Sequence, residues 1–172
     1  MNQSDIHRTY FDSPVGRLLL GASAKGLVGI YFDGVHRRQP ADTEGWIDGS
    51  SRFGEVVTQL TEYFAGERRD FKVAIDWEHR GTPFFHEVWK ELITVPYGET
   101  VSYLDLAGRI GRPKAVRAVA MANARNPISI IIPCHRVIGS NGKLTGYAGG
   151  MNVKKFLLDF EGPAGSGKAP IY

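Results

Sequence analysis

The sequence predicts an α+β fold in which a strand-rich N-terminal part precedes a helical C-terminal part. Three short aliphatic or aromatic runs, at residues 9–12, 16–21 and 26–33, are separated by turn residues, which is typical of a meander of strands. From residue 83 onward, apolar residues recur mainly at helical spacing. A chain of 172 residues can hold one domain of ordinary size or two small domains that share an interface.

We place an N-terminal domain at residues 1–76, a linker at 77–82 and a C-terminal domain at 83–162. The tail at 163–172 contains Gly, Pro and Ser, and we expect it to be disordered. The chain starts without the apolar segment of a secretory signal, and no apolar stretch approaches the roughly 20 residues that cross a bilayer. We therefore expect no membrane partner and a cytoplasmic protein, although a nuclear or nucleoid location would leave the same pattern.

Within the N-terminal domain, the polar residues 34–52 predict a long connecting loop, and residues 53–64 predict a helix that Gly66 ends. Alternating apolar residues predict one more strand at 71–75. The histidines here and at the start of the next domain are scattered, and we assign to surface or structural positions His7, His36, His79 and His86. No cluster in this domain indicates chemistry.

The C-terminal domain begins with the pattern of a helix-turn-helix. Thr82-Pro83 opens a first helix, which ends at the turn Pro96-Tyr97-Gly98. Ser102 and Asp105 have the Ser-x-x-Asp spacing of a second helix start. A corner at Gly111-Arg112-Pro113 precedes a helix over residues 114–125, with Pro113 in its first turn. Two short helices around a Gly-containing turn are typical of a helix-turn-helix.

Further along, the apolar run 128–132 predicts a buried strand that stops at Pro133, because proline cannot donate to a sheet ladder. Asn141-Gly142 indicates a tight hairpin. Residues 152–161 predict a last helix, whose charges lie at unfavourable ends: Lys154 near its N-terminus and Glu161 near its C-terminus. Such placement suggests specific partners, and a histidine is the natural partner of Glu161.

The charge is distributed unevenly along the chain. Residues 106–158 contain no Asp or Glu and nine basic residues, so this segment carries +9, while the remaining 12 basic and 18 acidic residues give −6. Solvated surfaces usually mix both signs. The asymmetry therefore predicts a face that binds a polyanion, and nucleic acid is the obvious one.

The second helix of the expected helix-turn-helix is rich in alanine, at Ala115, Ala118 and Ala122. Small residues would let the helix backbone approach DNA closely, which matters most in the minor groove, about 6 Å wide. Helix propensity alone explains the same alanines equally well. Both interpretations stay open.

Cys134 is the only cysteine, so it can form neither an internal disulfide nor a site with several thiolates. A lone cysteine is by default a small core residue. Here, however, it follows Pro133 and precedes His135 and Arg136, where a structural cysteine would have apolar neighbours. The pattern favours a reactive thiol, which fits a reducing compartment.

These residues resemble the O6-alkylguanine-DNA alkyltransferases, a family of DNA-repair proteins. The resemblance is strong over residues 83–162 and loose before them. It rests on several motifs in the right order, namely Tyr-Gly-Glu-Thr-Val-Ser-Tyr at 97–103, Arg117 in Ala-Val-Arg-Ala-Val, Asn126-Pro127, Pro133-Cys134-His135-Arg136-Val137, Gly-Tyr-Ala-Gly-Gly at 146–150 and Glu161. The family implies a ribonuclease-H-like N-terminal domain and a winged helix-turn-helix C-terminal domain that carries the cysteine.

The resemblance also implies an activity. Cys134 would take the alkyl group of an O6-alkylguanine irreversibly, and that of an O4-alkylthymine less well, with no cofactor and no metal. Glu161 would orient His135, which would remove the thiol proton through a water molecule. Asn126 would tie the recognition helix to the loop that holds the thiol. Tyr103 would donate a hydrogen bond to guanine N3 and would therefore act in catalysis.

The resemblance implies further contacts to the substrate and to duplex DNA. The substrate-binding set comprises Tyr103, Val137, Tyr147, Ala148 and Lys154. The backbone of Ala148 would donate to O6, while the carbonyls of Val137 and Cys134 would accept from the exocyclic amine. The DNA-binding set comprises Lys114, Arg117, Ala118, Met121, Ala122 and Arg136. Arg117 would replace the flipped nucleotide in the stack, and a monomer would bind through the minor groove, with cooperativity left open.

The sequence departs from some relatives in the implied family. Ala148 stands where some have serine, which leaves a backbone donor without a hydroxyl. The N-terminal part has no cysteine for the zinc site that some members carry, so we expect no zinc. Members fused to a methylphosphotriester sensor need further cysteines, and alkyltransferase-like members lack the reactive one.

Two other classes of function remain as alternatives. A DNA-binding regulator without chemistry would use Cys134 only for packing, although it would need no Cys-His-Arg loop beside its recognition helix. A cysteine hydrolase would use Cys134 and His135, although no second base or oxyanion loop is evident.

Overall fold

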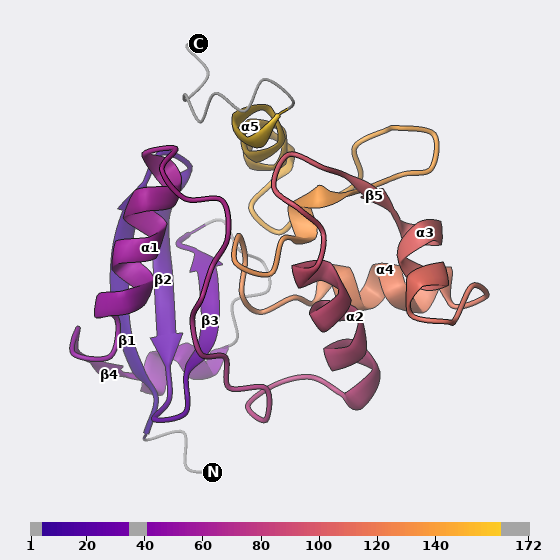
Figure 1. Cartoon of the computed structure of the whole chain (residues 1–172). Helices are drawn as coiled ribbons and strands as arrows, with labels where there is room; N and C mark the ends of the chain where they lie inside the picture. Colours follow the sequence, from indigo (N-terminus) through magenta and orange to yellow (C-terminus); the bar gives the residue numbers. More distant parts are fainter. Residues whose placement is uncertain (1–4, 35–40, 163–172) are drawn as a thin grey trace.

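The structure, a computed structural model, describes residues 5–34 and 41–162. His36, part of the loop expected at 34–52 and the tail expected at 163–172 lie outside the described residues. Figure 1 shows a sheet with one helix on one side of the molecule, a group of helices on the other, and the last helix across their end. The observed fold is α+β, as the sequence predicts.

The N-terminal sheet contains the expected meander of β1 (His7–Ser13), β2 (Gly16–Ala22) and β3 (Leu27–Phe32). A short strand, β4 (Ile47–Asp48), pairs parallel with β1, so the order is β3-β2-β1-β4. Side chains alternate between faces along a strand. Leu18 and Leu20 therefore join the main core, while Leu19 packs with Tyr31 and Trp46 on the other face. Both faces of β2 are covered.

The helix α1 (Gly54–Phe64) confirms the helix predicted at 53–64. The segment before it is only partly a loop, because a 3-10 turn at Ala41–Gly45 and β4 lie within residues 34–52. The strand predicted at 71–75 is wrong. The side chains of Phe71, Val73 and Ile75 are half-buried and those between them are exposed, but the backbone makes only one isolated bridge, from Ile75 to Leu27.

The C-terminal part contains α2 (Pro83–Ile93), α3 (Tyr103–Arg109), α4 (Val116–Ala124) and α5 (Met151–Glu161). Thr82 caps α2 through its side chain, and Ser102 and Asp105 form a capping box on α3. The predicted helix-turn-helix is thus formed by α3 and α4. However, α4 begins later than expected, because Pro113 lies in the preceding turn and not in the first helical turn.

Two short strands, β5 (Val101–Ser102) and β6 (Val137–Ile138), pair in parallel beside the helix-turn-helix. The turn expected at Asn141-Gly142 is present, with Gly142 N–H donating to the Gly139 carbonyl at 2.9 Å. Residues 143–150 form no strand, so the hairpin prediction holds only for the turn.

The strand predicted at residues 128–132 is also wrong. These residues are buried, but their backbone folds into successive tight turns. Ile132 N–H donates to the Ile128 carbonyl at 3.0 Å, and Ile131 N–H donates to the Ser129 carbonyl at 2.9 Å. An apolar run indicates burial without specifying where its backbone hydrogen bonds go.

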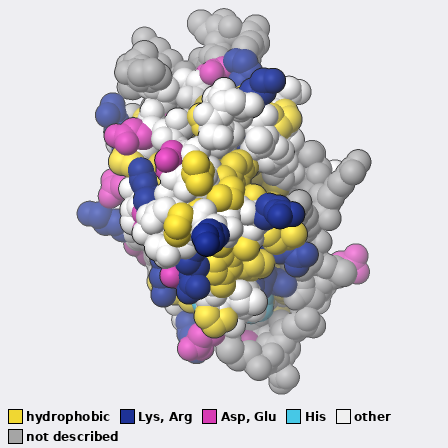
Figure 2. Space-filling model, turned by 90° about the vertical axis from the view of Figure 1, so that its right-hand side faces the viewer, with side chains coloured by type: hydrophobic (Ala, Val, Ile, Leu, Met, Phe, Trp, Pro, Cys, Tyr) yellow, Lys and Arg dark blue, Asp and Glu magenta, His cyan; other side chains and the backbone are white. Residues whose placement is uncertain are grey.

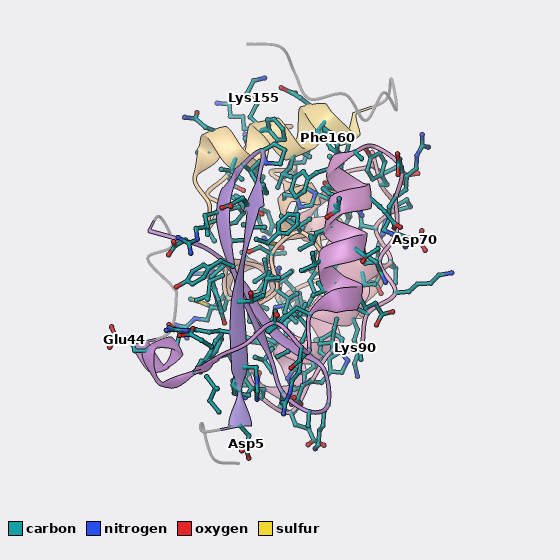
Figure 3. All side chains as sticks on the ribbon, turned by 90° about the vertical axis from the view of Figure 1, so that its left-hand side faces the viewer. Asp5, Glu44, Asp70, Lys90, Lys155 and Phe160 are labelled. Carbon is teal, nitrogen blue, oxygen red and sulfur yellow. The ribbon has the colours of Figure 1, made fainter. Side chains whose placement is uncertain are left out.

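One hydrophobic core joins the two parts of the chain. The same cluster contains Leu60 of α1, Trp89 of α2 and Phe160 of α5. Figure 3 shows α5 lying across the end of the sheet and of α1, with Lys155 pointing outward. No helix in the described residues is long and apolar enough to cross a membrane.

Candidate active site

Cys134 begins a 3-10 turn, Cys134–Arg136, immediately after the folded-back run at 128–132. We call residues 128–134 the thiol loop. Cys134 N–H donates to the Ile132 carbonyl at 2.8 Å, and Ile130 has a φ of 73°. A left-handed conformation is strained for a β-branched residue, and such strain concentrates at functional sites. The surrounding structure must therefore hold the loop in this conformation.

Two elements anchor the thiol loop from outside. From the end of α4, the Asn126 side-chain amide donates to the carbonyls of Ile132, at 2.8 Å, and Ile128, at 3.3 Å, and its oxygen accepts from Ile128 N–H at 2.9 Å. From the sheet, Ile30 of β3 forms an isolated parallel bridge with Ile128. Asn126 thus lies where it was expected, between the recognition helix and the thiol.

His135 and Glu161 form the contact that the sequence predicts between them. His135 Nε2 lies 2.9 Å from Glu161 Oε1, and both side chains are buried. Burial alone would raise the pKa of the Glu161 carboxyl, but His135 and Arg136 hold that pKa far below its usual range. Glu161 is therefore a carboxylate, and His135 Nε2 donates its hydrogen to it. In the neutral imidazole, the other ring nitrogen, Nδ1, is then the acceptor.

His135 Nδ1 is buried and has no hydrogen-bond partner among the described residues. Buried polar atoms are nearly always paired, so an exception calls for an explanation. An unprotonated imidazole nitrogen next to a cysteine in the sequence is suited to accept a proton from a thiol.

The environment of the thiol does not by itself favour the thiolate. Burial raises the pKa of Cys134, while the Asn126 side chain and the Lys154 ammonium act against that increase. Lys154 is itself buried, and its Nζ donates to the Val137 carbonyl at 2.6 Å. Burial lowers the pKa of Lys154, and Cys134 acts against that decrease. A general base is therefore needed to make the nucleophile.

The residues expected around the substrate lie in the segment that follows the thiol or contact that segment. Tyr103 is half-buried, and its hydroxyl lies 2.6 Å from Thr145 Oγ1. The ring of Tyr147 stands edge-on to His135, with centroids 6.4 Å apart. Burial and the neighbouring Cys134 raise the pKa of Tyr147 well above 10. Ala148 is half-buried in the same loop, and the Val137 carbonyl, although it already accepts from Lys154, keeps a second lone pair.

The exposed face of α4 and the turn before it carry four of the six side chains assigned to DNA binding. Arg117, Ala118 and Met121 are exposed, and Lys114 is exposed in the turn before the helix. Figure 2, which views the molecule from the side of the helix-turn-helix, shows hydrophobic side chains interspersed with Lys and Arg. The exposed hydrophobics of this part of the chain include Leu104 and Met121, 52% and 50% accessible. An exposed surface that is both apolar and basic is typical of a DNA-binding face.

Two assignments to DNA binding are wrong. Ala122 is fully buried, because it lies on the side of α4 that faces the core. Arg136 is 5% exposed, and its guanidinium donates to both oxygens of Glu161 and to the Val95 carbonyl at 2.6 Å. A buried carboxylate needs a compensating charge, and Arg136 supplies it.

Sequence reasoning missed one side chain of this centre. The hydroxyl of Tyr63, in α1, donates to Glu161 Oε1 at 2.6 Å. Nothing local marks Tyr63, which lies 98 residues before Glu161 in the chain. Only its position on the apolar side of a predicted helix could have suggested that it is buried.

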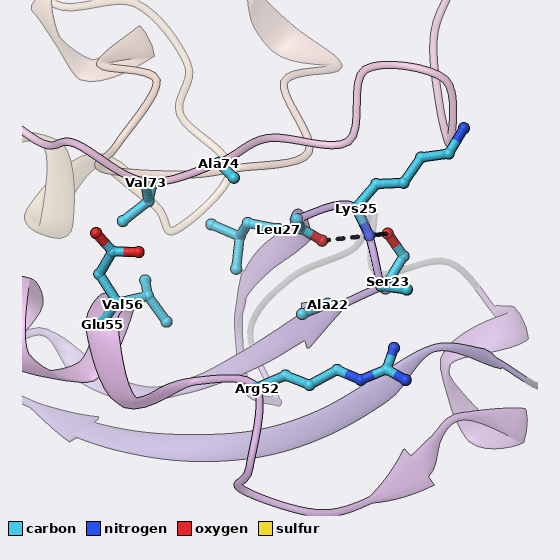
Figure 4. A pocket seen from close by; sticks show the side chains of 11 residues that line it. Ala22, Ser23, Lys25, Leu27, Arg52, Glu55, Val56, Val73 and Ala74 are labelled. Carbon is cyan, nitrogen blue, oxygen red and sulfur yellow. Dashed lines mark hydrogen bonds between the residues drawn. The ribbon is translucent and has the colours of Figure 1, made fainter.

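A cavity of about 420 Å³ lies away from this centre, between the turn that follows β2 and the start of α1, and it contains no comparable chemistry. Figure 4 shows the side chains that line it. Its polar groups are engaged in structure: Ser23 Oγ accepts from Lys25 N–H and donates to the buried Asp76, and Lys25 pairs with Glu78. Among the described residues, no three His, Cys, Asp or Glu side chains are placed to hold a metal ion.

Comparison with known proteins identifies relatives over nearly the whole chain. Residues 6–77 match the ribonuclease-like domain of 6-O-methylguanine DNA methyltransferase, and residues 83–163 match its DNA binding domain. The methylated-DNA–protein-cysteine methyltransferase of Methanosarcina acetivorans is 49% identical, over 91% of this chain and 99% of its own. The protein of the same name from Mycobacterium leprae is 46% identical, over 91% and 92%. The crystal structure of Mycobacterium tuberculosis OGT in complex with DNA is 47% identical, with a TM-score of 0.84 over 92% of this chain and 96% of that one.

Proposed function

The chain belongs to the family of methylated-DNA–protein-cysteine methyltransferases, and on that premise we propose that Cys134 itself takes the alkyl group from O6-alkylguanine in DNA. The protein is a DNA-repair alkyltransferase that binds DNA, and not a regulator without chemistry. The relatives that it matches over nearly their full length are named methylated-DNA–protein-cysteine methyltransferases, and one similar structure contains DNA. One observation carries the proposal for Cys134. It is the buried thiol followed by an imidazole whose far nitrogen is hydrogen-bonded to a carboxylate.

The reaction is a displacement at carbon. Cys134 Sγ attacks the alkyl carbon, the bond from that carbon to O6 breaks, and its electron pair returns to the guanine ring. The thiol proton passes from Cys134 Sγ to His135 Nδ1 through a bridging water molecule. A proton is finally restored to the guanine. The products are unmodified guanine and a thioether.

Glu161 and Lys154 assist the thiol in different ways. A carboxylate that accepts from Nε2 keeps the imidazole in the tautomer whose Nδ1 can accept a proton. The positive charge of Lys154 stabilises a developing thiolate without touching the imidazole. A neutral thiol is a weak nucleophile and is only a few per cent ionised at neutral pH.

The base would be recognised by groups around the thiol. We infer that Tyr103 donates to N3, that the Ala148 backbone donates to O6, and that the carbonyls of Cys134 and Val137 accept from the exocyclic amine. The pocket would accept O4-alkylthymine less well, because that base has no equivalent exocyclic amine to offer. Tyr147 would form a wall of the pocket, since its ring lies against His135.

The base must leave the duplex to reach a buried thiol. We infer that α4 enters the minor groove, where the small exposed Ala118 allows close approach, and that Arg117 fills the gap in the stack. Lys114 and Met121 would contact the flanking backbone and bases. The protein would act as a monomer in a reducing cytoplasm, with the chain divided at residues 77–82, between the two matched domains.

Stoichiometry tests this function. Intact mass would be measured after incubation with an excess of duplex DNA that contains O6-methylguanine. We expect one methyl adduct per molecule, located on Cys134, and none in Cys134→Ser, which should still bind the duplex. More than one methyl group transferred per molecule, or an adduct elsewhere, would contradict the proposal, because a thioether offers no leaving group that regenerates the thiol.

A further inference from the structure

The hydroxyl of Tyr63, in the N-terminal half of the chain, is hydrogen-bonded to the carboxylate that also binds His135. Tyr63 belongs to α1 and is fully buried among the rings of Phe64, Phe71, Tyr97 and Phe160. Its hydroxyl donates to Glu161 Oε1 at 2.6 Å, shorter than the 2.9 Å between the same oxygen and His135 Nε2. Two donors from distant parts of the chain therefore share one carboxylate oxygen.

Glu161 does not need Tyr63 for its orientation or for its charge balance. Arg136 donates to Oε2 through Nε at 2.8 Å and to Oε1 through NH2 at 2.9 Å. This two-point contact fixes the plane of the carboxylate and places a full positive charge beside it. The hydroxyl of Tyr63 must therefore be explained by a different effect.

That effect follows from the direction of the hydroxyl dipole. The hydrogen of Tyr63 points at Oε1, so the positive end of its O–H bond lies near the nitrogen that donates to the same oxygen. A positive charge on the imidazole is disfavoured by a nearby positive dipole end. In addition, an oxygen that already accepts a strong hydrogen bond is a weaker acceptor for another donor. Both effects make it harder for His135 to take a proton from the thiol.

The other polar and charged groups near His135 and Glu161 do not act on Glu161 Oε1 as the Tyr63 hydroxyl does. On the Glu161 side, the hydroxyl of Tyr97 reaches only the Phe160 carbonyl, at 3.4 Å, and Arg69 lies over the ring of Tyr97. On the thiol side, Lys154 donates to the Val137 carbonyl, and Tyr147 interacts with Cys134 and Glu161 through charge, without a hydrogen bond to Glu161. Tyr63 is thus the neutral donor placed to adjust the Glu161–His135 contact.

We propose that Tyr63 restrains the proton relay, so that the thiol of the resting protein is less reactive than the His135–Glu161 pair alone would make it. This inference rests on the proposed function, because a protein that acts once loses its activity whenever a small electrophile reaches the thiol before a damaged base does. Tyr63 acts through Glu161 and His135, and is therefore a positioning residue and not a catalytic one. Burial and Glu161 raise the pKa of Tyr63 well above 10, so it remains a donor throughout the working range.

The test compares Tyr63→Phe with the wild type and with Tyr97→Phe. Tyr97→Phe is the matched control, because it removes a hydroxyl from the same aromatic cluster without removing a hydrogen bond to Glu161. The rate at which iodoacetamide alkylates Cys134 would be followed by intact mass between pH 5 and pH 9, and thermal unfolding would verify that each variant is folded. We expect the profile of Tyr63→Phe to move to lower pH by about half a unit, which makes the thiol about threefold more reactive at a pH on its rising limb.

An unchanged profile, or one that moves to higher pH, would overturn the proposal, and so would an equal shift in Tyr97→Phe. The measurement uses a small electrophile and no DNA, so its outcome is independent of repair. A failure of the wild type to accept a methyl group from O6-methylguanine DNA would contradict the proposed function, whatever the effect of Tyr63→Phe on alkylation.

Discussion

The buried carboxylate of Glu161 accepts hydrogen bonds from Tyr63, His135 and Arg136 at the centre of the site. It lies at the C-terminal end of α5, where the helix dipole disfavours a negative charge by a few tenths of a kcal/mol. Four hydrogen bonds, one of them from an imidazole and two from a guanidinium, outweigh that cost. The position is therefore maintained by its partners and not by the helix.

Glu161→Gln should destabilise the protein at neutral pH by about 3–5 kcal/mol, because it leaves the buried guanidinium of Arg136 without a counter-charge. The folded pKa of Glu161 lies below its unfolded value of about 4.3. The stabilisation that the Glu161 carboxylate provides is therefore complete above the unfolded pKa and decreases as the pH falls toward the folded pKa. The difference in free energy of unfolding between wild type and variant, measured by denaturant titration, should narrow below about pH 4.

The same variant should also alter the chemistry. Without a carboxylate on His135 Nε2, we expect the alkylation profile of Cys134 to move to higher pH, with little change in affinity for duplex DNA. The control is Glu99→Gln, which changes an exposed carboxylate. Equal thiol profiles in wild type and Glu161→Gln would show that the carboxylate is structural only.

Arg117 gives a second prediction at this scale. If its side chain takes the place of the flipped nucleotide, Arg117→Ala should slow repair of duplex DNA severely and leave the reaction with free O6-benzylguanine nearly intact. If it only contacts a phosphate, binding weakens and repair recovers at saturating DNA. Single-turnover rates on the two substrates, at several DNA concentrations, separate these outcomes.

Local patterns predicted the site only where its residues are close in sequence or match a motif. Cys134, His135 and Asn126 lie where they were expected, and the contact between His135 and Glu161 follows from an unfavourable helix charge. The assignment of Arg136 to DNA failed, because the sequence does not show which of nine cations neutralises the buried carboxylate. Tyr63 was missed because its partner is supplied by tertiary packing alone.

At the scale of elements, helices were predicted better than extended segments. Caps and apolar stripes are local, so α1, α2, α3 and α5 lie close to their predicted positions. The runs at 71–75 and 128–132 have apolar side chains that are buried or half-buried, yet neither forms a strand. A ladder needs a partner strand at the right distance, and that depends on the rest of the fold.

Gly98 connects a turn to the end of α5. Its φ is +80°, and an added Cβ would lie 2.7 Å from the backbone oxygen of Glu161. Gly98→Ala should therefore cost about 1–3 kcal/mol in backbone strain and also displace Glu161, which would slow alkylation of the thiol. Gly34→Ala is the matched control, since Gly34 has a φ of +71° and open space around its Cβ position.

Denaturant unfolding and iodoacetamide rates would be measured for both glycine variants. Loss of stability is expected in each, but a slower thiol only in Gly98→Ala. A similar slowing in Gly34→Ala would mean that general destabilisation, and not displacement of Glu161, affects the thiol.

At the scale of the whole molecule, the thiol loop is held by both halves of the chain. Ser129 N–H of the loop donates to the Ile30 carbonyl of β3 at 3.3 Å, while Asn126, after α4, binds the loop from the other half. The same hydrophobic core extends through both halves. The N-terminal part therefore contributes to the position of the reactive atom, although the sequence assigned it no chemistry.

The charge asymmetry found in the sequence overestimates the cations available to DNA. Of the nine basic residues at 106–158, Arg136 and Lys154 are buried, Arg112 pairs with Glu87, and Lys155 pairs with Asp159. The five that remain are exposed and form no ion pair with the described residues: Arg109, Lys114, Arg117, Arg125 and Lys143. These five are the cations that the segment offers to DNA without first breaking an ion pair.

We therefore expect a plot of log K against log salt concentration for duplex binding to have a slope no steeper than about −4.5, whereas nine phosphate contacts would give about −8. The measurement is fluorescence anisotropy of an undamaged duplex with Cys134→Ser protein, between about 50 and 200 mM salt. Lys143→Ala should reduce the slope by about one if that side chain contacts a phosphate. Lys25→Ala, which removes a cation that pairs with Glu78 in the N-terminal part, should leave it unchanged. A wild-type slope near −8 would mean that cations outside the helix-turn-helix segment also reach the DNA, and that the interface extends over the N-terminal part.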